Sequence, residues 1–382
     1  MPYKVVSTER LPIKSWATDL EAGALDQAKN LANLPFAVKW VALMSDCHPG
    51  FGMPIGGVLA TDQVIIPNAV GVDIGCGMQA VRTSLKQISQ DDLKSIMGGI
   101  RELVPLGFNR HKERQDWTGF EQAPEIEIVM KELESSTHQL GTLGGGNHFI
   151  EIQQGSDGYV WLVVHSGSRN LGLKVATDFH KKAVALCQRW YSSLPDKDLS
   201  FFPLDSEEGQ SYLYAMNFCL AFARANRNLM MKRIKDAVQR CTGADFYDFV
   251  DVHHNYAALE NHFDRNVVVH RKGAIRARLG EPGIIPGSMG TSSYLVGGLG
   301  NPESFTSCSH GAGRRMGRKE AIRSLSLEEE QSKMEGVLGA PRTKDDLDEA
   351  PGAYKDIDMV MEAQTDLVVV RMNLKPLAVI KG

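Results

Sequence analysis

The chain has 382 residues, of which 43% are hydrophobic and 23% charged, so it is long enough to bury a sizeable core and lacks the composition of a disordered protein. Its formal net charge of −4 argues against indiscriminate nucleic-acid binding but still permits local basic patches. The N-terminal segment lacks the apolar region of a signal peptide, and no stretch reaches the roughly 18 apolar residues of a membrane helix, so we expect a cytoplasmic protein outside the membrane.

Two amphipathic helices are predicted. Ser89 marks the start of the first, and apolar residues then recur at helical spacing until Pro105 ends it. The second is long and covers about residues 211–240, with polar residues in its interior, namely Asn217, Arg224, Asn226 and Arg227. Buried polar groups need partners, so this helix either lines a site with one face or exposes that face to solvent.

Strand signals occur at 159–164, at 267–270 and at 366–370, with a partner for the last near 377–380. Helices and strands do not alternate regularly, which argues against a Rossmann fold or a TIM barrel. We therefore expect an α+β fold, built as a single compact domain over residues 1–382.

Basic residues gather in four short clusters, around Arg110, Arg227, Arg271 and Arg314. One such cluster alone is typical of a solvated helix face. Four of them beside motifs rich in Gly, His and Asp favour a segregated basic surface instead. For the cluster at Arg271 and Lys272, both an RNA-binding role and a solvated hairpin remain open.

Six short segments combine Asp, Cys or His with Gly, Ser or Asn: residues 45–50, 72–77, 144–151, 165–169, 251–255 and 309–314. Asp, Cys and His are the main protein ligands of divalent metals, and His165 follows a very apolar strand that would hold it rigidly. Each segment alone is typical of a structural turn, but together they predict a metal site. A thiolate among imidazoles favours zinc, whereas Asp73 with histidines suits manganese equally well. The six scattered cysteines form no Cys-x-x-Cys pair and indicate no disulfide framework.

The common phosphate-binding signatures are missing, because the sequence has neither a Gly-Lys-Ser/Thr P-loop nor a Lys-x-Asp-Gly motif. His310, in the turn Ser-His-Gly-Ala-Gly-Arg, is then the natural nucleophile for a phosphorus centre. Its flanking glycines allow phosphate to approach backbone N–H groups, and Arg314 can neutralise charge.

These motifs resemble, in order and along nearly the whole chain, those of the RtcB family of RNA ligases. The matching stretches are DCHPGFGMPIGG, GVDIGCGM, GTLGGGNHFIE, HSGSRNLG, HHNY, RKGA, PGSMG, SCSHGAGR, AYKDID and a closing Lys-Gly. The resemblance implies a single α+β domain with a central metal-lined cleft.

The resemblance also implies the use of two manganese ions. Cys76 would be shared between the two ions. Asp73, His165 and His254 would complete the shell of one ion, and His148 would help to hold the other.

For the nucleotide, the resemblance implies that GTP guanylylates His310 through a ring nitrogen. Tyr354 would stack on guanine, and Lys381 would contact the base or ribose. The full set of implied nucleotide-binding residues is Asn147, Glu151, Ser288, Ser293, Gly311, Ala312, Gly313, Tyr354 and Lys381. Arg169 is similar to a family arginine that binds the RNA backbone, and Asp46 and His48 match a motif tied to later chemical steps.

The implied reaction joins RNA that ends in a 3′-phosphate or 2′,3′-cyclic phosphate to 5′-hydroxyl RNA, in RNA repair or tRNA splicing, with an archease-like activator as a further partner. Two rivals remain. A metal-dependent phosphodiesterase or phosphatase that lacks ligation would need the metal ligands but not His310. An RNA-binding protein with a decayed site would lack ligands, and none of the expected ones is missing. The physiological RNA stays open between tRNA, rRNA and mRNA.

Overall fold

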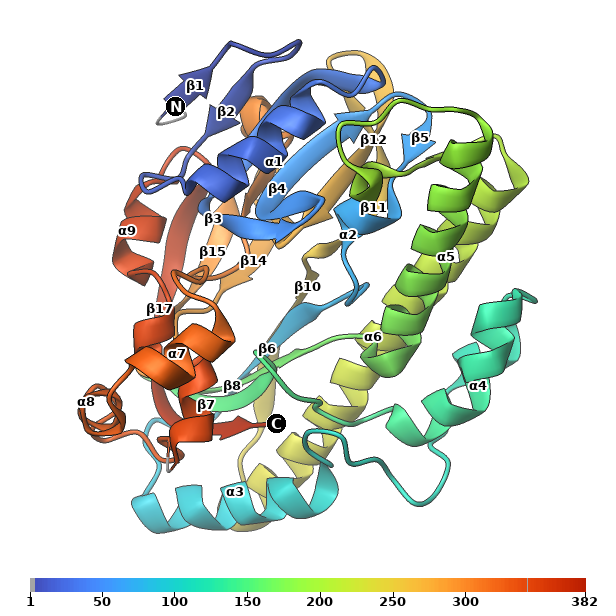
Figure 1. Ribbon diagram of the computed structural model, residues 1–382. Coiled ribbons are helices and arrows are strands. Elements are labelled where there is room, and N and C mark those ends of the chain that lie inside the picture. Colours follow the sequence, from blue (N-terminus) through green and yellow to red (C-terminus); the bar gives the residue numbers. More distant parts are fainter. Residues whose placement is uncertain (1–3, 342) are drawn as a thin grey trace.

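The computed structural model describes residues 4–341 and 343–382. Two large sheets form its centre (Figure 1). The first sheet has the strand order β1 (Lys4–Val6), β2 (Ile13–Ser15), β3 (Ala37–Phe51), β4 (Met53–Thr61), β12 (Arg265–Lys272) and β11 (Asn255–His262). The second sheet has the order β10 (Phe246–His253), β6 (Gly77–Thr83), β8 (Val160–Ser166), β7 (Phe149–Gly155), β17 (Val368–Lys381), β15 (Ser293–Gly298) and β14 (Pro282–Ile285).

Two short strand pairs complete the β-structure: β13 (Ala274–Arg276) with β16 (Ser307–Ser309), and β5 (Val64–Ile65) with β9 (Phe202–Pro203). Strands β2 and β3 pair in parallel, whereas the pairs within the second sheet are antiparallel. Mostly antiparallel sheets with helices packed outside them confirm the predicted α+β class.

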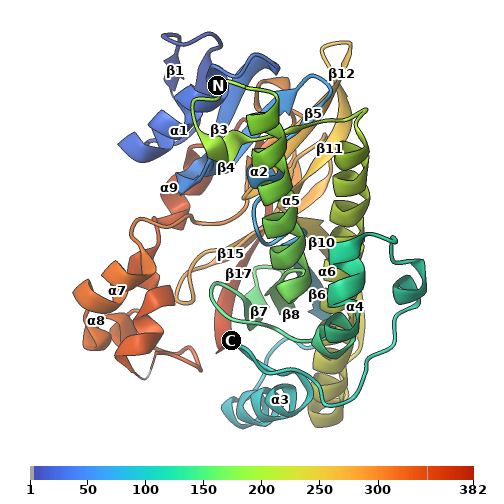
Figure 2. The same cartoon turned by 45° about the vertical axis from the view of Figure 1, so that its right-hand side comes forward.

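The helices lie around the sheets. They are α1 (Ala22–Ala32), α2 (Pro67–Val70), α3 (Gln90–Leu103), α4 (Glu127–Gln139), α5 (Arg169–Arg189), α6 (Glu207–Thr242), α7 (Arg318–Ser324), α8 (Leu327–Ser332) and α9 (Ile357–Glu362). Short 3₁₀ turns cover Thr118–Gln122, Lys197–Leu199, Pro302–Ser304, Lys344–Glu349 and Pro351–Ala353. Helices α4, α5 and α6 lie on one side of the molecule and α7 and α8 on the other, as both views show (Figures 1 and 2).

Both predicted helices are confirmed. The Ser89 side chain accepts a hydrogen bond from the Asp92 backbone N–H at 3.1 Å and caps α3, as serine does at helix starts. The long helix is α6, which buries Asn226 and Arg227 but leaves Asn217 and Arg224 exposed. Only part of its polar side therefore faces inward.

The predicted partnership of strands 366–370 and 377–380 is wrong, because residues 368–370 and 377–380 belong to the single strand β17. The first half of β17 pairs with β15 and the second half with β7. Pro376 interrupts the apolar pattern without ending the strand, since it lies at a register irregularity opposite β7, where a residue without an N–H is tolerated. The strands predicted at 159–164 and 267–270 are confirmed as parts of β8 and β12.

The order of the second sheet brings distant segments to one edge. Strands β10, β6, β8 and β7 are neighbours and run antiparallel, so the end of each lies beside the start of the next. Gly77 of β6 lies opposite His253 of β10 and Ser166 of β8. Phe149 of β7 lies opposite His165 of β8. The residues at these strand ends therefore meet at the same edge: Cys76, His148, His165 and His254.

Within residues 4–341 and 343–382, no helix combines the length and apolar character needed to cross a membrane. The six cysteines are free thiols, and Cys241 alone among them is exposed. The predicted absence of a disulfide framework is therefore confirmed.

Candidate active site

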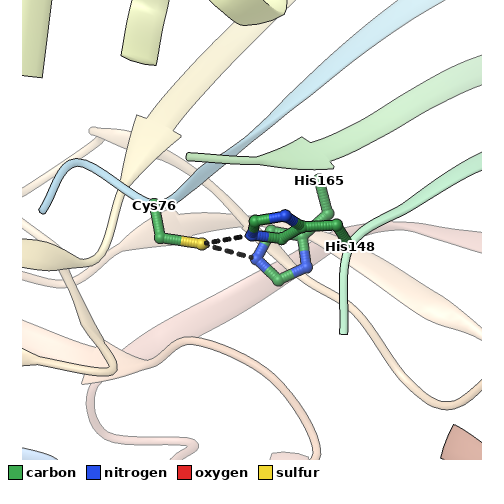
Figure 3. A group of neighbouring side chains, drawn as sticks. All are labelled: Cys76, His148 and His165. Atoms are coloured by element: carbon green, nitrogen blue, oxygen red, sulfur yellow. Dashed lines mark hydrogen bonds between the residues drawn. The ribbon is translucent and has the colours of Figure 1, made fainter. Parts of the chain in front are cut away.

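The candidate metal ligands form one connected group at this sheet edge. The Cys76 Sγ atom lies 3.3 Å from Nε2 of His148 and 3.2 Å from Nε2 of His165, and Figure 3 shows the sulfur facing both rings. An Asp73 carboxylate oxygen lies 3.0 Å from Nε2 of His148. Nε2 of His254 lies 3.5 Å from Nε2 of His165. The structure thus brings together all five residues expected to bind metal.

Backbone carbonyls orient two of these rings. Nδ1 of His148 lies 3.1 Å from the Leu143 carbonyl, and Nδ1 of His165 lies 3.0 Å from the Asn147 carbonyl. Because a carbonyl only accepts hydrogen bonds, each Nδ1 carries a proton. Nε2 of His165 then presents a lone pair toward Cys76, whereas Nε2 of His148 donates to the Asp73 carboxylate. A histidine that binds metal through one ring nitrogen typically donates the N–H of the other to a carbonyl or carboxylate in this way.

Burial sets the charges of this group. Burial and the Asp73 carboxylate raise the pKa of the Cys76 thiol well above its ordinary value. Burial also lowers the pKa of His165 and His254 well below the ordinary value, so both rings are neutral at neutral pH. For Asp73, burial opposes ionisation, but the hydrogen bond and charge of His148 and the charge of Arg169 outweigh it and lower the pKa to about 2.

These residues fit a divalent metal. The Nε2 atoms of two neutral imidazoles, His165 and His254, face each other at 3.5 Å. Nδ1 of His254 is buried and has no hydrogen-bond partner among residues 4–341 and 343–382. A cation would use the free lone pairs and would favour the Cys76 thiolate, which metals bind in preference to the thiol.

His310 follows β16 and lies beside this group, its ring centroid 4.8 Å from that of His254. Its Nδ1 donates to the Asp46 carboxylate at 2.6 Å. The same Asp46 oxygen accepts from the backbone N–H groups of His310 at 3.1 Å and Gly311 at 3.3 Å. The proton therefore lies on Nδ1, and Nε2 is left as the nucleophilic nitrogen.

The turn after His310 is fitted closely around Asp46. Gly313 has φ +73°, and a Cβ atom there would clash with the Asp46 carbonyl, so only glycine suits the position. Nδ1 of His48 lies 3.0 Å from the same carbonyl, and burial lowers the pKa of His48 to about 4. Asp46 thus links His310 and His48, the three residues expected to be catalytic.

Four of the expected nucleotide residues, Glu151, Ser293, Tyr354 and Lys381, fall into two connected groups. In the first, Gln153 donates to Glu151 at 2.5 Å and to Ser293 at 3.0 Å. Burial raises the pKa of Glu151 to about 8, against the opposing charge of Lys381 and the hydrogen bond of Gln153. Ser288 lies apart from this group and contacts Thr291 at 3.0 Å.

The second group surrounds Glu349, which is 3% exposed. Its carboxylate accepts from the Tyr354 hydroxyl and lies 3.7 Å from Nζ of Lys381. Arg314 and Arg318 contact its other oxygen at 3.1 and 3.0 Å. Lys381 and Glu349 line a cavity of about 450 Å³ together with Arg101, Gly146, Met289 and Gly382, among others, and this volume lies in the range of small-molecule sites.

The remaining expected residues lie close to these groups. Ala312 is buried in the core, and Asn147 contributes the carbonyl that orients His165. Arg169 begins α5 at φ +58°, with Nη1 3.1 Å from Nδ1 of His148. Its guanidinium only donates, so it forms no hydrogen bond with a protonated Nδ1 and can bind an anion.

Sequence reasoning missed Glu349. This residue ends the acidic run 345–349, which contains none of the predicted site residues. The Glu-Ala-Pro-Gly step directly before the AYKDID motif was the available signal, because it places Glu349 five residues from Tyr354. Arg271 and Lys272 form neither a solvated hairpin nor an RNA surface, since Arg271 is fully buried against Glu260 at 2.6 Å and Lys272 donates to the Phe51 carbonyl at 2.7 Å.

Comparison with known proteins identifies the family. The model of a family described as "tRNA-splicing ligase RtcB" matches residues 27–132 and 117–382. The chain is 40% identical to the RNA-splicing ligase RtcB of Escherichia coli, over the whole of both chains. It is 31% identical to the tRNA-splicing ligase RtcB of Pyrobaculum aerophilum, over 100% of this chain and 97% of that protein. It is 33% identical to the RNA-splicing ligase RtcB of Mycobacterium tuberculosis, over 93% of this chain and all of that protein.

These matches extend along the chain and include every segment that contributes to the group around Cys76 and His310. The chain belongs to the RtcB family.

Proposed function

We propose that this chain is a cytoplasmic, single-domain RNA ligase that uses GTP and two divalent metal ions, assigned as Mn²⁺. It joins a 3′-phosphate or 2′,3′-cyclic phosphate end to a 5′-hydroxyl end, in RNA repair or tRNA splicing, with an archease-like activator as a further partner. The observation that carries this proposal is the contact between His310 and Asp46 beside the five candidate metal ligands.

In the proposed first step, Nε2 of His310 attacks the α-phosphorus of GTP. A P–N bond forms, the bond to the β-phosphate oxygen breaks, and pyrophosphate leaves. The ring becomes cationic during the attack, and the Asp46 carboxylate on Nδ1 stabilises that charge.

In the second step, an oxygen of the RNA 3′-phosphate attacks the same phosphorus and the P–N bond breaks, so GMP passes to the RNA. In the last step, the 5′-hydroxyl oxygen attacks the RNA phosphorus and GMP leaves. A 2′,3′-cyclic phosphate is first opened by water to a 3′-phosphate.

Asp73, Cys76, His148, His165 and His254 would hold the metal ions, which would supply charge neutralisation for the phosphoryl groups. Arg169, whose buried Nε has no hydrogen-bond partner in the described part of the chain, would bind the RNA backbone. Of the nucleotide residues, Tyr354 would stack on guanine, and Lys381 would contact the base or ribose.

A joining assay tests this function. Two RNA oligonucleotides, one with a 3′-phosphate and the other with a 5′-hydroxyl, are incubated with the protein, Mn²⁺ and either GTP or ATP. The proposal predicts a joined product with GTP and the 3′-phosphate, and none with a 3′-hydroxyl end. Release of phosphate without joining, or opening of the cyclic end without joining when a 2′,3′-cyclic phosphate oligonucleotide replaces the 3′-phosphate one, would support the rival phosphatase or phosphodiesterase instead.

Replacing Asp46 with Asn should slow the transfer of GMP to the protein by roughly 10²- to 10⁴-fold, because a neutral amide cannot stabilise the cationic ring. Single-turnover kinetics with α-labelled GTP measures the rate. Asp26→Asn, at an exposed carboxylate paired with Lys29, is the control and should match the wild type. Equal rates for Asp46→Asn and the wild type would remove Asp46 from the mechanism.

The buried Glu151 carboxyl should make the free energy of unfolding fall as pH rises. Its folded pKa of about 8 lies above the ordinary value of 4.5, so between these values the folded state holds a proton that the unfolded state has released. The contribution of Glu151 to the free energy of unfolding is therefore full at low pH and is lost as pH rises toward 8.

Glu151→Gln removes this dependence. The free energy of unfolding of the variant, relative to that of the wild type, should rise by on the order of 3 kcal/mol between about pH 5 and about pH 8.5. Urea unfolding at each pH measures it. Glu102→Gln, at an exposed site, should show no such gain. Parallel pH profiles of Glu151→Gln and the wild type would contradict the assigned pKa.

A further inference from the structure

We infer that Asn226 and Arg227, adjacent residues of α6, are positioning residues that hold the candidate metal ligands in one arrangement before metal binds. The inference rests on the proposed metal centre. Both side chains are buried, Asn226 at 0% and Arg227 at 1% exposure, within a helix face that is otherwise largely apolar. Burial of a charge and an amide is costly unless each polar atom has a partner.

Arg227 reaches three of the segments that carry ligands. Its Nη1 donates to the carbonyl of Gly75 at 3.0 Å and to that of Ser166 at 3.1 Å. These residues are the direct chain neighbours of Cys76 and His165. Its Nε donates to Asp251 at 2.8 Å, and Asp251 lies on β10, three residues before His254.

Asn226 reaches the remaining segments. Its Oδ1 accepts from the backbone N–H groups of Gly141 at 2.7 Å and Thr142 at 3.1 Å, at the start of the loop that leads to His148. Its Nδ2 donates to the Gly167 carbonyl at 3.2 Å. Gly167 packs directly against the Asp73 carboxylate, where a Cβ atom would clash.

Together the two side chains contact the segments of all five ligands without touching any ligand atom themselves. They bind mainly backbone groups, which fixes where each segment lies relative to the others. Residues behind the ligands of a metal centre commonly change metal affinity by about 10- to 100-fold. The planar guanidinium of Arg227 serves three acceptors at fixed angles, and lysine, as a single point donor on a flexible stem, cannot reproduce that pattern.

The test compares Arg227→Lys with the wild type, using the whole chain. Isothermal calorimetry with Mn²⁺ alone should show about 10- to 100-fold weaker binding in the variant, whereas circular dichroism of the metal-free protein should be unchanged. Arg224→Lys is the matched control, because Arg224 also pairs with Asp251, at 3.1 Å, but its side chain is 64% exposed. This control should bind Mn²⁺ like the wild type.

Hydrogen exchange gives a second measurement that needs no metal. The amides of Gly141 and Thr142 should exchange slowly in the metal-free wild type and faster in Asn226→Ser, because serine cannot reach both. If Arg227→Lys does not fold, Asn226→Ser decides the inference by calorimetry and exchange together.

Wild-type Mn²⁺ affinity in a folded Arg227→Lys, or unchanged exchange and affinity in Asn226→Ser, would overturn the inference and leave the proposed function intact. A wild type that binds no Mn²⁺ at all would instead overturn the proposed metal centre, and this inference with it.

Discussion

Replacing His310 with Ala should abolish RNA joining, with a loss of roughly 10⁴-fold or more, because it removes the nitrogen proposed to form the P–N bond. The Asp46 carboxylate would then have no ring to orient, although it would still accept from two backbone N–H groups. The fold should survive, since the His310 side chain is partly exposed at 14%. Denaturing electrophoresis of labelled RNA measures the product.

His180→Ala is the control for this prediction, because His180 is also a partly buried histidine with a carboxylate partner, Asp198, at 3.5 Å. It should join RNA at the wild-type rate. His310→Ala should also bind Mn²⁺ as the wild type does, because its ring lies outside the ligand group. Joining by His310→Ala at the wild-type rate would contradict a histidine intermediate.

Replacing Cys76 with Ser should weaken metal binding by about 10²-fold or more and abolish joining. The sulfur lies between His148 and His165 at 3.3 and 3.2 Å, so its loss affects every metal bound there. A serine hydroxyl ionises far less readily than a thiol and is a poor anionic ligand in this buried place. Calorimetry with Mn²⁺ and with Zn²⁺ measures the affinities and shows which ion the site prefers.

Cys187→Ser is the matched control, because Cys187 is also buried and its sulfur accepts from the Phe201 backbone N–H at 3.4 Å. It should keep the metal affinity of the wild type. Unchanged Mn²⁺ and Zn²⁺ affinity in Cys76→Ser would mean that the ligand group around Cys76 is not the metal site.

The candidate site could be predicted from the sequence because its residues stand in recognisable motifs at strand ends. Cys76 and His165 were found in this way. Their convergence could not be derived from the chain alone, because it depends on the order β10-β6-β8-β7 in the second sheet. That order joins segments up to about 180 residues apart, and only the family resemblance indicated that the segments form one site.

Residues that act through other residues were harder to predict. Asn226 and Arg227 were recognised as polar positions of a long helix, yet the sequence left open whether they faced solvent. Their partners are backbone carbonyls and N–H groups, which carry no signature in a sequence. The continuity of β17 was also hard to predict, because Pro376 interrupts its apolar pattern, whereas the sheet accommodates this residue at an irregular register.

The central claim, that His310 carries GMP, is tested most directly by label transfer. The protein is incubated with α-labelled GTP and Mn²⁺, denatured, and digested to locate the label. The account predicts acid-labile label on the peptide that contains His310 and none in His310→Ala. Absence of label with manganese, zinc, cobalt and magnesium, with or without an activator protein, would contradict the nucleotide chemistry and make a metal-dependent phosphodiesterase the leading interpretation.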